Sequence, residues 1–262
     1  LRPAAAATRV LVESDAAAGV ETVDGGQVRA PIVVNALSAR QAFLDCVGPA
    51  LLDVGFQSAV AEERPRYASA QVRLALDGAP GDERTRANMS RRLVYAPSKE
   101  ELADAYGAAR RGGVGSPLIL EAVFPSMFDR HAAPERGQVV SLLAHPVALL
   151  EEPPAEFRAA VERAVRETFE RIAPGAGRRI VSADVRLPAD LAKPLGAPVC
   201  AFAGAASVLP AWSRARALTG ASGVAGYFFC GPEAQIGAGL SGAAGRRAAE
   251  AAVRHHRKKL RS

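Results

Sequence analysis

The sequence predicts an α/β fold in which a domain built from both ends of the chain carries an inserted α+β domain. Apolar runs typical of strands buried in a parallel sheet lie near both ends, "PIVVNA" at 31–36 and "VAGYFFCG" at 224–231. Between them, strands with alternating polar and apolar residues are interspersed with two helices. This order of elements is expected when one domain is inserted into another.

The N-terminal segment predicts short strands followed by a helix. The strands are expected at 8–14 and within 18–37, with a hairpin turn at 24–26, because the glycines there tolerate the positive φ that such turns need. A helix is expected from an N-cap at Ser38 to a C-cap at Gly48. Its apolar positions are Ala42, Phe43 and Cys46.

The middle of the chain predicts more strands and two amphipathic helices. Ser98 and Glu101 form a capping box at the start of a helix that ends near Gly112. A second helix is expected at 154–175, because five apolar residues share one face: Phe157, Val161, Val165, Phe169 and Ile172. Strands are expected at 67–78, 91–97, 116–126 and 137–146, and a strand followed by a short helix within 178–196.

The remaining segments predict a loop and a terminal helix. Residues 197–223 are rich in glycine, alanine and serine and predict a loop-dominated stretch, in which Trp212 is expected to pack against the protein. Residues 239–259 predict a long helix at the end of the chain.

Composition favours a cytoplasmic protein without metal. The three cysteines are far apart and odd in number, which argues against a disulfide framework and a zinc site and fits a reducing cytoplasm. No apolar run approaches the roughly 20 residues of a membrane span, and no signal peptide is recognisable.

The net charge of +6 is partly concentrated at 254–261. We interpret this cluster as a solvated helix end whose cations suit the helix dipole, with contact to an acidic membrane as the alternative. No basic stripe with interleaved aromatic residues is present, so no nucleic-acid partner is expected.

A literal G-x-G-x-x-G motif occupies residues 237–242, spelled G-A-G-L-S-G. A dinucleotide-binding domain needs a second strand after the following helix, and the 20 residues after Gly242 leave no room for one. The loop can still receive a pyrophosphate, because the helix after it begins with free N–H groups. Alternatively, the glycines and alanines allow tight helix packing.

The residues around this loop carry a family resemblance. The segments "YFFCG" and "IGAGLSGAAGRRAA" resemble the C-terminal flavin signature of phytoene-desaturase-like FAD-dependent oxidoreductases, within the amine-oxidase-like superfamily. Supporting similarity extends over nearly the whole chain, in "GVETVDGGQVRAPIVVNALS", "FPSMFDRHAAPERGQVVSLLAHP" and "ERIAPGAGRRIVSADVRLPADL".

The resemblance implies a partial FAD/NAD(P)-binding domain formed by residues 1–47 and 220–262, with a substrate domain at 48–219 that contains an antiparallel sheet. It implies hydride transfer from a hydrophobic small-molecule substrate to the flavin. The terminal segment would contact the ribityl and pyrophosphate groups of FAD, through Cys230, Gly231, Gly237, Gly239, Ser241, Gly242 and Ala243, with a weaker assignment for Asn35.

No catalytic residue is assigned. Three polar residues of the substrate domain, Asp129, His131 and His145, are candidates for facing its cavity, with turn and surface roles as the favoured interpretation.

The sequence departs from the family pattern in ways that put FAD binding in doubt. Gln235 and Ile236 replace a His-Pro pair, Ala238 replaces a glycine, and Arg247 replaces an asparagine. The family's N-terminal βαβ unit is also absent from this sequence, so we expect FAD binding by this chain alone to be weak or absent.

Two origins would explain the absent unit. The chain is a piece of a longer reading frame, which the lack of an initiator methionine favours, or a second chain supplies the nucleotide-binding unit. The alternative function is a non-catalytic binding or scaffold subunit that has lost FAD. In each case an exposed sheet edge is expected, unstable alone or paired with a partner.

Overall fold

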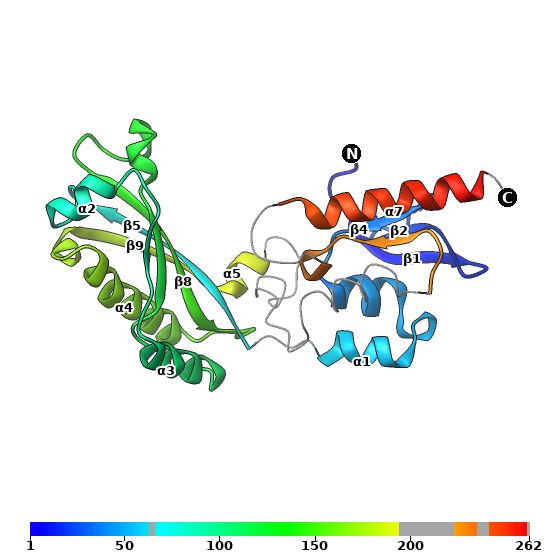
Figure 1. Ribbon diagram of the computed structural model, residues 1–262, viewed down its shortest axis with the longest axis horizontal. Coiled ribbons are helices and arrows are strands. Elements are labelled where there is room, and N and C mark those ends of the chain that lie inside the picture. Colours follow the sequence, from blue (N-terminus) through cyan, green and yellow to red (C-terminus); the bar gives the residue numbers. More distant parts are fainter. Residues whose placement is uncertain (63–65, 194–222, 235–240, 261–262) are drawn as a thin grey trace. The chain divides into compact units, whose positions relative to one another are not determined.

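The computed structural model describes residues 1–62, 66–193, 223–234 and 241–260 of the chain. The chain divides into two compact units, which Figure 1 shows. The terminal unit contains Leu1–Arg64 and Ala205–Ser262, and the central unit contains Pro65–Gly204. The functional domain limits expected at 47 and 220 stay predictions.

The central unit is built on a five-stranded antiparallel sheet with the order β6-β7-β8-β5-β9. Along β5 every second side chain is buried, as the alternating sequence predicts. The strands are β5 (Tyr67–Leu76), β6 (Leu93–Tyr95), β7 (Ile119–Val123), β8 (Gln138–Ala148) and β9 (Ile180–Arg186).

Helix α4 (Ala155–Ile172) supplies the other half of the central core. Its predicted apolar face is confirmed, because Phe157, Val161, Val165 and Phe169 lie in the same buried cluster as the inward side chains of the sheet. The unit also contains α2 (Glu83–Asn88), α3 (Lys99–Arg110), α5 (Pro188–Ala192) and the short 3₁₀ segments η3 (Pro125–Met127), η4 (Arg130–Ala132) and η5 (Ala176–Arg179).

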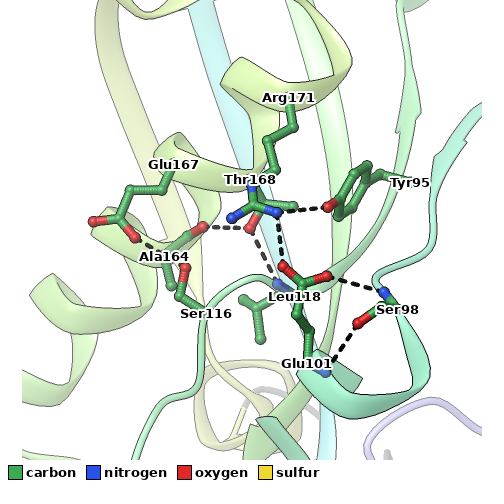
Figure 2. A network of polar contacts seen from close by, with 9 residues as sticks. All are labelled: Tyr95, Ser98, Glu101, Ser116, Leu118, Ala164, Glu167, Thr168 and Arg171. Atoms are coloured by element: carbon green, nitrogen blue, oxygen red, sulfur yellow. Dashed lines mark hydrogen bonds and ion pairs between the residues drawn. The ribbon is translucent and has the colours of Figure 1, made fainter. Parts of the chain in front are cut away.

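A polar network joins α3 to the last turn of α4 (Figure 2). The predicted capping box is present, since Ser98 Oγ accepts from Glu101 N–H at 3.2 Å and Glu101 Oε2 accepts from Ser98 N–H at 3.0 Å. The other carboxylate oxygen of Glu101 accepts from Arg171 Nη1 at 2.9 Å, and Arg171 Nη1 lies 2.9 Å from the hydroxyl of Tyr95. These contacts hold Arg171 and Tyr95 in fixed positions.

A buried threonine links α4 to the start of β7. Thr168 is fully buried, donates its hydroxyl proton to Ala164 O at 2.7 Å and accepts from Leu118 N–H at 3.1 Å. The N–H of Leu118 is thereby paired inside the core, where an unpaired amide would destabilise the fold.

The described part of the terminal unit contains two small sheets. An antiparallel sheet with the order β1-β2-β3 consists of β1 (Ala7–Glu13), β2 (Ala16–Thr22) and β3 (Gln27–Arg29). The hairpin turn predicted at 24–26 is confirmed between β2 and β3, with Gly25 at a φ of 79°. The second sheet is a parallel pair of β4 (Val33–Asn35) and β10 (Tyr227–Phe229).

The expectation that "PIVVNA" is buried on both faces is wrong. Val34, at the centre of β4, is 50% exposed. Among the described residues β4 pairs only with β10. Successive side chains of a strand point to opposite faces, so the partly buried Val33 and Asn35 share one face and the face of Val34 is left open.

Helices pack around the parallel pair. Arg40–Val47 (η1) is a π-helix that ends at Gly48, and the predicted apolar positions Ala42, Phe43 and Cys46 are buried. The terminal helix is α7 (Ala243–Lys259), which begins four residues later than expected. The unit also contains α1 (Val54–Glu62) and the 3₁₀ segments η2 (Pro49–Leu51) and η8 (Pro232–Ala234).

Candidate functional site at the carboxyl edge of the parallel strands

The parallel pair brings two distant segments to one edge. Tyr227 is opposite Val33 and Phe229 is opposite Asn35, so both strands end on the same side of the sheet. Cys230, directly after β10, donates its N–H to Asn35 O at 2.8 Å. In open α/β sheets, ligands bind outside the carboxyl ends of the strands, and this edge is therefore the candidate site.

An aromatic cluster beneath the strands fixes this edge. The ring of Phe43 packs against the rings of Phe56, Tyr227 and Phe229, with 4.8–5.8 Å between ring centroids. The hydroxyl of Tyr227 donates to Ala42 O at 2.9 Å, and burial raises the pKa of this phenol well above its ordinary value. The tyrosine is therefore a neutral structural anchor rather than an acid–base group.

Gly231 is required by the packing of the chain itself. A Cβ at this position would lie 2.1 Å from Leu37 O and 2.4 Å from the ring of Phe229. Because a backbone oxygen cannot move aside as a flexible side chain can, only glycine fits here. The structure thus gives Gly231 a reason to be glycine that involves no ligand.

The start of α7 is open. Gly242 occupies the N-cap with a φ of 67°, a conformation that favours glycine, and a Cβ at Gly242 or Gly245 would meet nothing within 4 Å. Ser241 Oγ accepts from Ala243 N–H at 3.3 Å. Within the described residues, the N–H groups of Ala244 and Gly245 have no partner, and the first turn carries no acidic side chain. Such a helix start attracts an anion.

The opposite face of α7 is used for packing. Its buried residues are Ala244, Ala248 and Ala252, one turn apart, and the helix packs against β10. Small side chains allow this close approach, and the ring of His255 adds an edge contact with Phe228 at 5.9 Å. The packing interpretation is confirmed for the alanines. Gly242 and Gly245 leave open space, and a ligand there stays a prediction.

Five of the seven sequence-predicted site residues lie in the described part of the chain. Cys230 and Gly231 are at the strand ends, where burial raises the pKa of the Cys230 thiol, and Ser241, Gly242 and Ala243 are at the start of α7. Gly237 and Gly239, with the departures at Gln235, Ile236 and Ala238, fall outside the described residues. The ligand role of all seven stays a prediction.

Arg247 has a structural role that the sequence did not indicate. Its Nη2 donates to Ala234 O, which joins η8 to the second turn of α7. The only signal in the sequence was its departure from the asparagine of the family pattern.

The three polar candidates of the central unit differ in burial: two are exposed and one is partly buried. Asp129 and His131 are exposed, and Asp129 Oδ1 accepts from His131 N–H at 2.9 Å in an ordinary turn. His145 is partly buried, with Nε2 2.9 Å from Tyr106 Oη and Nδ1 3.1 Å from Ala68 O. A neutral ring satisfies both contacts by donating at Nδ1 and accepting at Nε2.

The end of α7 is basic and exposed, in agreement with cations placed at a helix C-terminus. A search of the described helices finds none with the length and apolar character needed to cross a membrane.

Comparison with known proteins finds relatives but no family profile that matches the chain. The chain is 26% identical over 264 residues to Pyridine nucleotide-disulfide oxidoreductase domain-containing protein 2 of Mus musculus, covering 94% of the chain and 45% of that protein. The protein of the same name from Rattus norvegicus is 26% identical over 253 residues, covering 90% and 44%. The chain thus spans less than half the length of these curated relatives.

Two solved structures share the fold. An oxidoreductase from Methanosarcina mazei superimposes with a TM-score of 0.51 at 16% identity, over 94% of the chain and 48% of that structure. Cyclohexylamine oxidase from Brevibacterium oxydans gives a TM-score of 0.52 at 14% identity, over 98% and 49%. The predicted mixed α/β fold with an antiparallel sheet is confirmed, and the chain is a homologue of the two mammalian relatives with a fold found in oxidoreductases.

Proposed function

We propose that the chain is the part of a flavin-dependent oxidoreductase that holds the ribityl and diphosphate groups of FAD. The observation that carries the proposal is the open start of α7, a helix that packs against β10 and in which a Cβ at Gly242 or Gly245 would meet nothing within 4 Å. The names of the mammalian relatives and the flavin-signature resemblance support the same function.

The described residues fit such a cofactor. The N–H groups of Ala244 and Gly245 and the positive end of the helix dipole suit a diphosphate, and no first-turn carboxylate repels it. The hydroxyl of Ser241, which accepts from Ala243 N–H at 3.3 Å, can donate its own proton at the same place. Contacts from Gly237 and Gly239 are part of the proposal.

When bound, FAD would accept a hydride from a carbon atom of the substrate. The residues of this chain would bind and orient the cofactor, with the aromatic cluster around Phe43 holding the strand ends in place. Phytoene-dehydrogenase-like specificity and a hydrophobic substrate are the finer part of the proposal.

A complete cofactor site requires more protein. The chain spans less than half of its curated relatives, and a two-stranded parallel sheet with a half-exposed central valine is small for a nucleotide-binding domain. We propose that a nucleotide-binding unit, from a longer form of the protein or from a second chain, completes the sheet and binds the adenosine half of FAD.

The test is FAD titration, followed by quenching of flavin fluorescence, of the chain alone and of the complete assembly. We expect weak or no binding to the chain alone and saturable binding to the complete protein. In the complete protein, Gly245→Val should weaken binding about tenfold or more, because its side chain would enter the open space. Ala249→Val, at an exposed position one turn later, is the matched control.

Two results would contradict the proposal. One is a complete protein that purifies and folds without taking up FAD, which favours the non-catalytic binding subunit instead. The other is a Gly245→Val variant that binds FAD as tightly as the Ala249→Val control.

A further inference from the structure

A pocket of about 470 Å³ lies in the central unit, at the free edge of β6. Its walls come from α2, from β6 and from the end of α4, and all of its lining residues belong to the central unit. Three of them are arginines, Arg84, Arg92 and Arg171, and we call this site the arginine pocket.

Arginines outnumber carboxylates among the described residues that line the arginine pocket. Its one acidic lining residue, Asp82, caps α2 by accepting from Thr85 N–H at 2.6 Å. This hydrogen bond, with smaller contributions from the nearby arginines, lowers the pKa of Asp82, so the carboxylate stays ionised but is occupied. Glu121 and Glu101, which lie outside this lining, pair with Arg92 and Arg171. Among the described residues, the guanidinium of Arg84 is therefore the lining cation that no carboxylate pairs with.

The three arginines differ in how many hydrogen bonds and ion pairs their guanidinium groups make with the protein. Arg171 is held by Tyr95 and Glu101, as Figure 2 shows. Arg92 reaches Glu121 through Nη1 at 3.0 Å, while its side chain is 67% exposed. Arg84 is exposed, and its guanidinium makes no hydrogen bond or ion pair with any residue in the described ranges. The guanidinium of Arg84 and the remaining N–H groups of Arg92 are therefore available to a ligand.

We propose that the arginine pocket binds a small-molecule anion that carries phosphate or carboxylate groups. Arginine presents planar paired N–H donors that match these anions, and such charge-assisted hydrogen bonds are the strong ones in water. The volume lies in the range of small-molecule sites and exceeds the size of an inorganic ion. The ligand is therefore a phosphorylated or carboxylated metabolite rather than free phosphate.

The other lining residues provide aromatic, apolar and amide groups that such a ligand can contact. The fixed position of Arg171 places a cation 5.9 Å from the centre of the Tyr95 ring, and Leu93 and Ile172 add apolar surface. Asn88, whose amide donates to Arg84 O at 2.8 Å, also lines the site. An anionic group would bind to Arg84 and Arg92, and the body of the molecule would lie against Tyr95.

This site is separate from the proposed flavin site. The arginine pocket lies within the central unit, and the open start of α7 belongs to the terminal unit. FAD binding and anion binding can therefore fail independently, and each is measured with its own ligand.

The test is isothermal titration calorimetry on the full chain with two probes, inorganic pyrophosphate and citrate, and with glucose as the neutral control. We expect saturable binding of at least one anion, weakened by added salt, and none of glucose. Arg84→Gln and Arg92→Gln should each raise Kd about tenfold or more. Arg86→Gln, on the same short helix but outside the lining, should change Kd less than about twofold.

The relative affinities of pyrophosphate and citrate, in the wild type and in the variants, distinguish the possible ligand classes and test the proposal. Preference for pyrophosphate assigns a phosphorylated ligand, and preference for citrate assigns a carboxylated one. The proposal is overturned if neither anion binds saturably, or if Arg86→Gln weakens binding as much as Arg84→Gln. It is also overturned if a glutamate-rich peptide binds the pocket arginines while both small anions fail. Circular dichroism of each variant confirms that these exposed substitutions leave the fold intact.

Discussion

The central and terminal units bury their strands to different degrees. In the central unit, four strands of the five-stranded sheet and helix α4 share one cluster with fully buried large side chains such as Leu74, Phe124 and Phe169. In the described part of the terminal unit, five short strands form a three-stranded and a two-stranded sheet, and the central valine of β4 is half exposed. The central unit closes its own core, whereas in the terminal unit one face of β4 is left half exposed.

The large continuous core and the candidate cofactor site therefore lie in different units. The central unit obtains its stability from contacts within one continuous core, as expected of an independent domain. The terminal unit carries the candidate cofactor site, and its stability should depend on what joins the strand pair. Substitutions in the two units should therefore have different consequences.

The largest expected effect tests whether the units are independent. Phe169→Ala removes a fully buried ring from the central core and should cost about 3–5 kcal/mol of unfolding free energy. Hydrogen exchange followed by mass spectrometry should show faster exchange in β5 and β8 and unchanged exchange in β1 and β2. Equal acceleration in both units would mean that they unfold together. Phe128→Ala, which removes a 74% exposed ring, is the control and should change neither the unfolding free energy nor the exchange rates.

A smaller effect should distinguish two glycines of the terminal unit. Gly231→Ala places a Cβ against Leu37 O and should cost about 1–3 kcal/mol by overpacking. Gly245→Ala meets open space in the first turn of α7 and should stabilise the helix by about 0.5–1 kcal/mol. Urea unfolding followed by circular dichroism gives both values. A Gly231→Ala variant as stable as Gly245→Ala would show that the loop after β10 adapts.

The smallest effect concerns pH and the central unit. Burial lowers the pKa of His145 below its ordinary value, so the neutral ring contributes stability that is complete above about pH 6.5. This contribution is lost as the pH falls through the lower pKa of the folded state, because the unfolded chain then binds the proton first. Unfolding free energies measured between roughly pH 7.5 and pH 5 should fall more in the wild type than in His145→Gln.

The exposed histidine of the same unit provides the comparison for that experiment. His131→Gln should keep the wild-type dependence on pH. A His145→Gln variant whose stability still falls as steeply as that of the wild type would assign the acid sensitivity to other groups.

Elements with a strong local pattern could be predicted from the sequence. The capping box at Ser98, the apolar face of α4 and the alternation of β5 are local signals, and the structure contains each of them. Helix α1 was not predicted, because Gly55 weakens its start and its apolar anchors, Phe56 and Val60, are few. The six-residue α2 is too short to show a helical period.

The sites depend on contacts that sequence spacing does not show. The glycine-rich segment was visible as a motif, but only the structure shows that Gly231 packs against the chain while Gly242 and Gly245 stay open. The arginine pocket was not predicted at all. Arg84 and Arg171 are far apart in the sequence, and the antiparallel sheet and α4 bring them to one cavity.

The exposed strand pair has a consequence for handling the protein. Strand β4 has no second partner among the described residues, and an unpaired strand edge is a template on which another chain can add a strand. The aggregation of the isolated chain should therefore rise with protein concentration and begin at Val33–Asn35. The strand edge that we propose joins a nucleotide-binding unit is, in the chain alone, the place where self-association is expected to begin.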